Sequence, residues 1–232
     1  MKTEWLRRLG GDEVVVFFHG WGMDRRSVPS LAGAAGGMVP GGGSCDVLRG
    51  ADERLPDLLL CFGYHSLDIE PEVLGVLAGY RSLRVVAWSF GVWVARQVAL
   101  PAVSGAVALN GTLYPVDAVR GIRPDVFAVT LAGWSVEARR RFYRRMCGSP
   151  DVEAVFLRVA PEREVVDQQE ELAALQVALE RPAVATWMYD YAVVGRGDLI
   201  FSAAAQERGW QGLCRTVVVD MPHYPFCRFG NL

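Results

Sequence analysis

The sequence has little of what marks a disulfide framework, a metal site or a membrane protein. Its 232 residues include five cysteines and three histidines. The cysteines are odd in number and scattered singly, which favours reduced thiols in a cytoplasmic protein, and no cysteine or histidine pair has the spacing of a zinc site. No apolar run is long enough to span a membrane. Residues 1–10 carry charges but no apolar stretch, so we expect no signal peptide.

The chain also lacks a strong charge of either sign. Its formal net charge is -2, which gives no general attraction to nucleic acid or to an anionic membrane. A hydrophobic fraction of 51% and a charged fraction of 22% are typical of a soluble protein with a sizeable core. The length fits one large α/β domain, with two small domains as the alternative. We therefore expect a soluble, monomeric enzyme that needs no metal or other cofactor.

Short apolar runs of strand length alternate with stretches that suit helices. We expect the strands at 14–18, 58–62, 83–87, 106–109, 187–194 and 216–219. Helices are expected at 71–79, 92–100 and 202–210, with a weak helix at 30–38 and a Gly/Pro-rich loop at 36–44. Because each strand is apolar on both faces, the pattern predicts a mostly parallel sheet covered by helices on both sides.

The pattern changes between residues 115 and 182, where helical, charged segments replace strong strands. We expect one helix from Ser135 to about Met146 and another over 162–179. We interpret 115–182 as a helical cap inserted into an α/β core made of 1–114 and 183–232. A small separate domain is the alternative, which the absence of linker-like flanking sequence disfavours.

Ser89 lies where a β-branched strand ends and a helix begins. A serine at such a turn matches the nucleophile elbow of α/β-hydrolases, whose pattern is G-x-S-x-G. The residues two before and two after the serine must be small for strand and helix to approach. Here they are Ala87, a departure from the pattern, and Gly91. A serine that merely caps a helix is the alternative.

A serine nucleophile needs a histidine base and a carboxylate that orients it. In α/β-hydrolases these follow the serine in the order Asp or Glu, then His. Only His223 follows Ser89, since His19 and His65 precede it. Asp198 lies in a glycine-rich turn after the penultimate strand and is the predicted orienting carboxylate, ahead of Asp190 within that strand.

Acyl transfer also needs N–H donors for the negative oxygen that develops on the substrate. The backbone N–H of Phe90, directly after the nucleophile, is one expected donor. The other should come from the loop after an early strand, and His19-Gly20-Trp21-Gly22 is such a loop. Its glycines allow a tight fold that exposes an N–H, which we assign to Trp21.

Five stretches together make the chain resemble an α/β-hydrolase and, more narrowly, the BioG type of pimeloyl-[acyl-carrier protein] methyl ester esterases. The tryptophans on either side of Ser89, with alanine in place of the first elbow glycine, are its most specific feature. The stretches are Phe17-Phe18-His19-Gly20-Trp21-Gly22-Met23-Asp24, Ala87-Trp88-Ser89-Phe90-Gly91-Val92-Trp93, Ala108-Leu109-Asn110-Gly111-Thr112, Asp198-Leu199-Ile200-Phe201 and His223-Tyr224-Pro225-Phe226.

The resemblance implies a serine hydrolase that cleaves the methyl ester of a pimeloyl chain on acyl-carrier protein, in biotin biosynthesis, through an acyl-enzyme. It implies Ser89 as nucleophile, His223 as base, Asp198 as orienting group, and the Trp21 and Phe90 N–H groups as oxyanion donors. A carrier-protein thioesterase or small-ester esterase on the same scaffold is the alternative. A catalytically silent binding scaffold is a third interpretation, disfavoured by the complete Ser-Asp-His set.

Two groups of residues are further candidates for substrate contact. Trp88, Leu113, Tyr114 and Trp134 are candidates to line an acyl channel, together with Trp21 and Phe90. On the expected helix from Ser135, arginines that include Arg140 and Arg144 surround an apolar stripe. This face suits the phosphate of a phosphopantetheine arm or an acidic carrier protein. A solvated arginine face, partly paired with Glu137, is the alternative.

Overall fold

A computed structural model of the protein describes residues 1–28 and 55–226. The weak helix expected at 30–38 and the loop expected at 36–44 lie outside the described residues. The strands of the described part are β1 (Lys2–Arg7), β2 (Glu13–Phe18), β3 (Asp57–Phe62), β4 (Ser82–Trp88), β5 (Gly105–Leu109), β6 (Tyr191–Gly195) and β7 (Arg215–Val219). The helices are η1 (Arg25–Ser27), α2 (Pro71–Ala78), α3 (Gly91–Ala95), α4 (Pro124–Ala132), α5 (Val136–Cys147), α6 (Pro150–Leu157), α7 (Val165–Ala178) and α8 (Ala203–Trp210).

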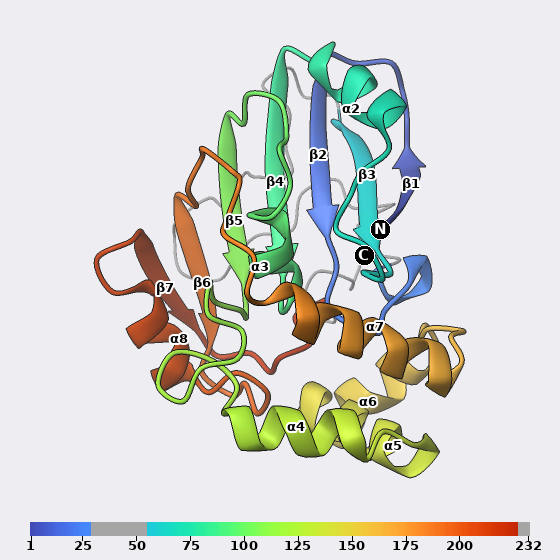
Figure 1. Cartoon of the computed structure of the whole chain (residues 1–232), viewed down its shortest axis with the longest axis vertical. Helices are drawn as coiled ribbons and strands as arrows, with labels where there is room; N and C mark the ends of the chain where they lie inside the picture. The colour runs from blue at the N-terminus through green and yellow to red at the C-terminus, as the bar shows by residue number, and fades with distance from the viewer. Residues whose placement is uncertain (29–54, 227–232) are drawn as a thin grey trace.

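The described strands form one sheet in the order β1-β3-β2-β4-β5-β6-β7 (Figure 1). Only β1 is antiparallel, and the other strands pair in parallel. The chain runs outward from β2 to β3 and then crosses back to place β4 on the other side of β2. The carboxyl ends of β2 and β4 therefore meet where the strand order reverses, which is where open α/β sheets bind ligands.

Alternation along the strands divides the core between the two faces of the sheet. In β2, Val14 and Val16 contribute to one buried cluster, and Val15 and Phe17 contribute to the other. All four side chains are fully buried. This two-sided burial is the reason for the continuous apolar runs, and it confirms the predicted parallel sheet with helices on both faces.

Helices α4 to α7 follow β5 and lie across the end of the sheet to which the parallel strands point (Figure 1). Their starts carry clear local signals. Ser135 and Ser149 accept hydrogen bonds from backbone N–H groups of the first turns of α5 and α6, while Pro124 begins α4. None of the helices in the described ranges is long and apolar enough to cross a membrane.

The helix after Ser89 is shorter than predicted. The sequence suggests 92–100, whereas α3 ends at Ala95. The carbonyl of Arg96, which would accept from Leu100 in a continuing helix, accepts instead from the N–H groups of Val184 and Ala185. A returning segment of the chain thus uses the acceptor that the next helical turn requires.

The strand expected at 187–194 begins later, at Tyr191. The preceding residues are held by side-chain contacts beside the sheet: Tyr189 donates its hydroxyl hydrogen to the Val92 carbonyl, and Asp190 accepts from the Ala106 N–H. The aromatic side chains of this stretch therefore reflect packing beside the sheet rather than a place in the strand ladder.

Four elements, η1, β1, α4 and α6, were not predicted individually, and a third predicted element was too long. Strand β1 pairs with β3 at the edge of the sheet, and α4 and α6 lie within the segment that was expected only to be helical in general. The helix expected over 162–179 begins at Val165.

Candidate active site

Ser89 lies in the strained turn that the elbow pattern predicts. Its φ is 59°, a left-handed conformation that costs about 1–2 kcal/mol for a residue with a Cβ. The turn is possible because its neighbours are small: a Cβ on Gly91 would lie 2.4 Å from the His19 carbonyl oxygen, and one on Gly111 would lie 2.3 Å from the Ser89 carbonyl oxygen. Ala87 is fully buried between β2 and β5, so its single methyl group is accommodated there.

His223 lies between Ser89 and Asp198. Its Nε2 is 2.9 Å from the Ser89 Oγ, and its Nδ1 is 2.8 Å from Asp198 Oδ2. An ionised carboxylate only accepts, so Nδ1 carries the hydrogen and Nε2 of the neutral ring is left to accept from the serine hydroxyl. All three side chains are buried, which limits competition from water for these hydrogen bonds. The arrangement can remove a proton from the Ser89 hydroxyl.

Asp198 is held by donors on both oxygens. The backbone N–H groups of Ile200 and Phe201 donate to Oδ1 at 2.8 and 2.9 Å. The side chain of Gln206, from α8, donates to Oδ2 at 2.9 Å, beside the hydrogen bond from His223. The sequence alone did not single out Gln206, because its only signal is a position on a helix close in sequence to Asp198.

The backbone around His223 is also anchored. Its carbonyl accepts from Trp88 Nε1 at 2.8 Å and from Asn110 Nδ2 at 3.0 Å. Asn110 has a positive φ of 44°, and its Oδ1 accepts from the Gly195 N–H, so it links the ends of β5 and β6 to the histidine loop. In the sequence, Asn110 was noted only as part of the Asn-Gly-Thr stretch of the family resemblance.

The loop after β2 passes close to Ser89. A Cβ on Gly20 would lie 3.3 Å from the Ser89 Cβ. Within residues 1–28 and 55–226, the backbone N–H groups of Trp21 and Phe90 have no acceptor. Two N–H groups without an internal partner therefore lie on the two segments that border the serine.

A small pocket, partly open to solvent, adjoins Ser89. Its lining is mostly apolar and comes from the sheet edge and from α4, α5 and α7. The lining residues are Trp21, Ser89, Phe90, Ile122, Val126, Phe127, Thr130, Phe142, Arg145, Leu172 and Ile200. Arg145 and Thr130 are its polar side chains besides the serine. Arg145 belongs to the predicted arginine face, whereas Thr130 was not singled out from the sequence.

The other predicted contact residues lie away from this lining. Trp88 points into the opposite core cluster, because it is one residue from Ala87 on a strand whose side chains alternate. Leu113 packs against the core. The guanidinium carbon of Arg120 lies over the Tyr114 ring, 3.5 Å from the ring centre. Trp134 packs against Trp21 behind the pocket wall, with the ring centres 4.5 Å apart.

Helix α5 has the predicted stripe, with Ala138 and Phe142 packed against the core and Met146 fully buried. Arg140 and Arg144 are exposed and lie outside the pocket, which Arg145 reaches instead. Within the described chain no ion pair joins Glu137 to these arginines.

The two remaining histidines have separate surroundings. His19 is fully buried, and burial lowers the pKa of its ring to about 3. Its Nδ1 accepts a hydrogen bond from the Gly20 N–H at 2.8 Å, which fixes the backbone at the start of the loop after β2. His65 is partly exposed and lies 2.9 Å from Asp167.

A family profile matches most of the chain. Residues 49–232 match the profile of the family described as "Pimeloyl-ACP methyl esterase BioG". The chain is 35% identical over 220 residues to a protein of Bacteroides fragilis (strain 638R) named malonyl-[acyl-carrier protein] O-methyltransferase. The similarity covers 91% of this chain but 39% of that protein, so the chain spans about two fifths of this relative's length.

Solved structures support the same assignment. The crystal structure of BioG from Haemophilus influenzae has a TM-score of 0.81 and 29% identity, covering 99% of this chain and 96% of that one. An esterase from Exiguobacterium antarcticum, 13% identical, has a TM-score of 0.60 over 95% of this chain and 87% of that one, and shows the α/β-hydrolase fold alone. The chain therefore belongs to the BioG family of pimeloyl-ACP methyl esterases, a family of carboxylic ester hydrolases.

Proposed function

We propose that this protein hydrolyses the methyl ester of a pimeloyl group carried on acyl-carrier protein, with Ser89 as the nucleophile. The observation that carries this proposal is the chain of contacts from Ser89 through His223 to Asp198, with hydrogen-bond distances of 2.9 and 2.8 Å, beside an apolar pocket. Membership of the BioG family supports the substrate class.

In the proposed mechanism, Ser89 Oγ attacks the ester carbonyl carbon while His223 Nε2 takes the hydroxyl proton. Asp198 holds the ring in the required tautomer and stabilises its charged form. The tetrahedral intermediate collapses, the bond to the methoxy oxygen breaks, and His223 returns the proton so that methanol leaves. Water, deprotonated by His223, then attacks the acyl-enzyme, and release of the carboxylic acid regenerates the serine hydroxyl.

The Trp21 and Phe90 N–H groups are the proposed donors to the negative oxygen of both tetrahedral intermediates. Such donors act only where charge develops, and removing one typically lowers kcat by about 10²–10³-fold. We also propose that residues 115–182 act as a cap over the core formed by 1–114 and 183–232. The side chains that α4, α5 and α7 contribute to the pocket support this role.

The pocket's composition suits a methylene chain. Its wall is built largely from aromatic and aliphatic side chains, such as Phe127, Phe142 and Leu172, which favour burial of an aliphatic acyl segment. The name of the Bacteroides fragilis relative is that of an enzyme that methylates an acid on acyl-carrier protein. Methyl transfer to a carrier-bound acid forms a methyl ester, which is the bond that this site is suited to hydrolyse.

An assay with a carrier-bound methyl ester tests the proposal. Pimeloyl methyl ester on acyl-carrier protein is incubated with the wild type and with Ser89→Ala, and the carrier is analysed by intact mass. We expect the wild type to remove the methyl group and leave the acid attached to the carrier, whereas Ser89→Ala is inactive. Release of the acyl chain from the carrier would instead identify a thioesterase.

Exposed arginines on α5 are the proposed contact for the carrier. Arg140, Arg141, Arg144 and Arg145 are all exposed, and among the described residues none of them forms an ion pair. An unpaired arginine face suits an acidic protein or the phosphate of its prosthetic arm. The combined change Arg140→Glu and Arg144→Glu should weaken activity on the carrier-bound ester and leave a free methyl ester unaffected. Equal effects on both substrates would contradict docking at this face.

A further inference from the structure

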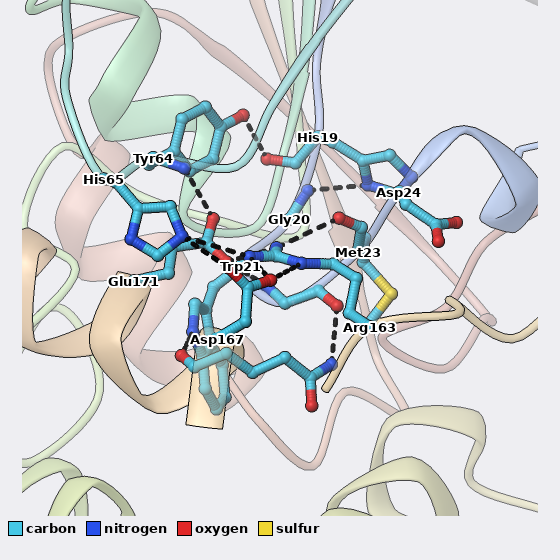
Figure 2. A network of polar contacts seen from close by, with 12 residues as sticks. His19, Gly20, Trp21, Met23, Asp24, Tyr64, His65, Arg163, Asp167 and Glu171 are labelled. Atoms are coloured by element: carbon cyan, nitrogen blue, oxygen red, sulfur yellow. Dashed lines mark hydrogen bonds and ion pairs between the residues drawn. The ribbon is translucent and has the colours of Figure 1, made fainter. Parts of the chain in front are cut away.

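The loop after β2 is held from outside the sheet by side chains of α7 (Figure 2). Glu171 Oε2 accepts from the Gly22 N–H at 3.1 Å, and Gln168 Nε2 donates to the Gly22 carbonyl at 2.7 Å. The two side chains are three residues apart, which places them on the same face of the helix. Both polar groups of the Gly22 backbone are thus bound by one helix.

The same helix also fixes the residue before Gly22. The indole Nε1 of Trp21 donates to the Gln168 carbonyl at 2.8 Å. On the other side, the Gly20 N–H donates to His19 Nδ1. The peptide group that carries the Trp21 N–H therefore lies between two anchored peptide groups. Without these anchors the flanking glycines would leave the backbone free to rotate, and Gly22 already adopts a φ of 74°.

Glu171 is a fully buried carboxyl surrounded by donors. Besides Gly22, the Tyr64 N–H donates to it at 2.8 Å and Arg163 Nη1 at 2.5 Å. Burial raises the pKa of Glu171, and the guanidinium of Arg163 and the two N–H groups act against that rise. A buried ion pair often stabilises a fold no more than apolar residues of similar size. An apolar side chain, however, would leave the Gly22 and Tyr64 N–H groups without an acceptor.

Arg163 has a second carboxylate partner, and the two differ in what else they contact. Asp167, also on α7, pairs with Arg163 at 2.6 Å and with His65 at 2.9 Å, and it is partly exposed. It makes no hydrogen bond to the described residues of the loop after β2, whereas Glu171 does. Arg163 Nη1 itself also donates to the Met23 carbonyl of this loop at 3.3 Å. The two carboxylates therefore separate the ion pairing of Arg163 from direct carboxylate contact with Gly22.

We propose that Glu171 and Gln168 are positioning residues for catalysis. By fixing both polar groups of Gly22, they hold the preceding peptide so that the Trp21 N–H faces the oxygen that becomes negative during ester hydrolysis. This inference rests on the proposed function of Ser89 and the Trp21 N–H. It links the oxyanion site to α7, a helix that contributes no reacting group.

The test compares Glu171→Gln with Asp167→Asn, using a small free methyl ester that does not involve the carrier protein. Glutamine in place of Glu171 would keep the size of the side chain. Its amide NH₂ would, however, face one of the groups that now donate to the carboxylate, so that hydrogen bond would be lost. The negative charge on this oxygen develops on the way to the tetrahedral intermediates and is absent from the bound ester. We therefore expect Glu171→Gln to lower kcat by about 10–100-fold, as for a donor that is displaced rather than removed. KM should stay within about twofold of wild type, since ground-state binding is unchanged. Asp167→Asn, the matched control, should keep the wild-type kcat.

A second readout and a second variant keep the test decisive. The affinity for a trifluoromethyl ketone, which forms a tetrahedral adduct with a serine, should fall by the same factor as kcat. If Glu171→Gln does not fold, Gln168→Met, which removes the donor to the Gly22 carbonyl, is measured in the same way. A folded Glu171→Gln or Gln168→Met protein with wild-type kcat would overturn the proposal, as would an equal loss in Asp167→Asn. Residual activity of Ser89→Ala in the same assay would refute the proposed function itself.

Discussion

Replacing Gly91 with alanine tests the close approach of α3 to the loop after β2. An added Cβ would lie 2.4 Å from the His19 carbonyl oxygen and 2.5 Å from that of Phe18. Both are backbone atoms, so no side-chain rotation relieves the clash. Real Cβ atoms essentially never lie closer than 3.0 Å to such an atom. The start of α3 and the end of β2 must therefore separate by about 0.6 Å.

We expect this separation to cost stability and activity together. Overpacking that requires backbone movement typically destabilises by about 1–3 kcal/mol, which lowers Tm by roughly 2–4 °C per kcal/mol in a chain of this size. The moved residues precede Trp21, and a displacement approaching 1 Å lowers catalytic rates by up to about 100-fold. Thermal melts and initial rates on a small methyl ester measure the two effects.

Gly75→Ala is the matched control. Gly75 is also helical, in α2, but it is exposed and a Cβ there would meet no atom within 4 Å. Alanine should therefore stabilise the protein by about 0.5–1 kcal/mol without changing the rate. The reasoning is refuted if Gly91→Ala melts and reacts like the wild type, or if the two variants behave alike.

Three further predictions concern the reacting groups and their surroundings. Asp198→Asn should lower kcat by about 10³–10⁴-fold in steady-state assays, because an amide no longer holds the His223 tautomer; a small loss would exclude an orienting role. Ser89→Gly should be more stable than Ser89→Ala to urea by up to about 1 kcal/mol, since glycine relieves the positive φ at some cost in chain entropy; the reverse order would show that the turn is unstrained. Burial lowers the pKa of His19 from 6.5 to about 3, so the folded protein binds fewer protons than the unfolded chain between these values and loses stability as the pH falls. Urea titrations should show the wild type losing about 2 kcal/mol more than His19→Gln between pH 7 and pH 5; equal losses would contradict this.

Sequence periodicity was sufficient for the parallel sheet but not for its edges. Buried strands such as β2 and β4 are visible as apolar runs because both faces are covered. Strand β1 has one neighbour and is only half-buried, so its sequence is polar and mixed. The helix α6 carries local signals that predict it, with Ser149 as cap and Pro150 at the first position.

The proposed reacting groups follow from chain order and turn chemistry, whereas the supporting groups do not. Ser89 and His223 could be singled out because few residues satisfy the order and spacing of the fold family. Gln206 and Glu171 approach the site from helices whose placement depends on tertiary packing. Which side chains line the pocket depends on how each helix is rotated about its own axis. For this reason Arg145, and not Arg144, lies in the lining.

The central claim is that Ser89 is an activated nucleophile, and covalent labelling tests it most directly. The wild type, Ser89→Ala and His223→Ala are treated with a fluorophosphonate probe, and the adduct is mapped by mass spectrometry. We expect one adduct on Ser89 in the wild type, none in Ser89→Ala, and much slower labelling in His223→Ala. An unlabelled wild type, or equal labelling of Ser89→Ala, would contradict the account.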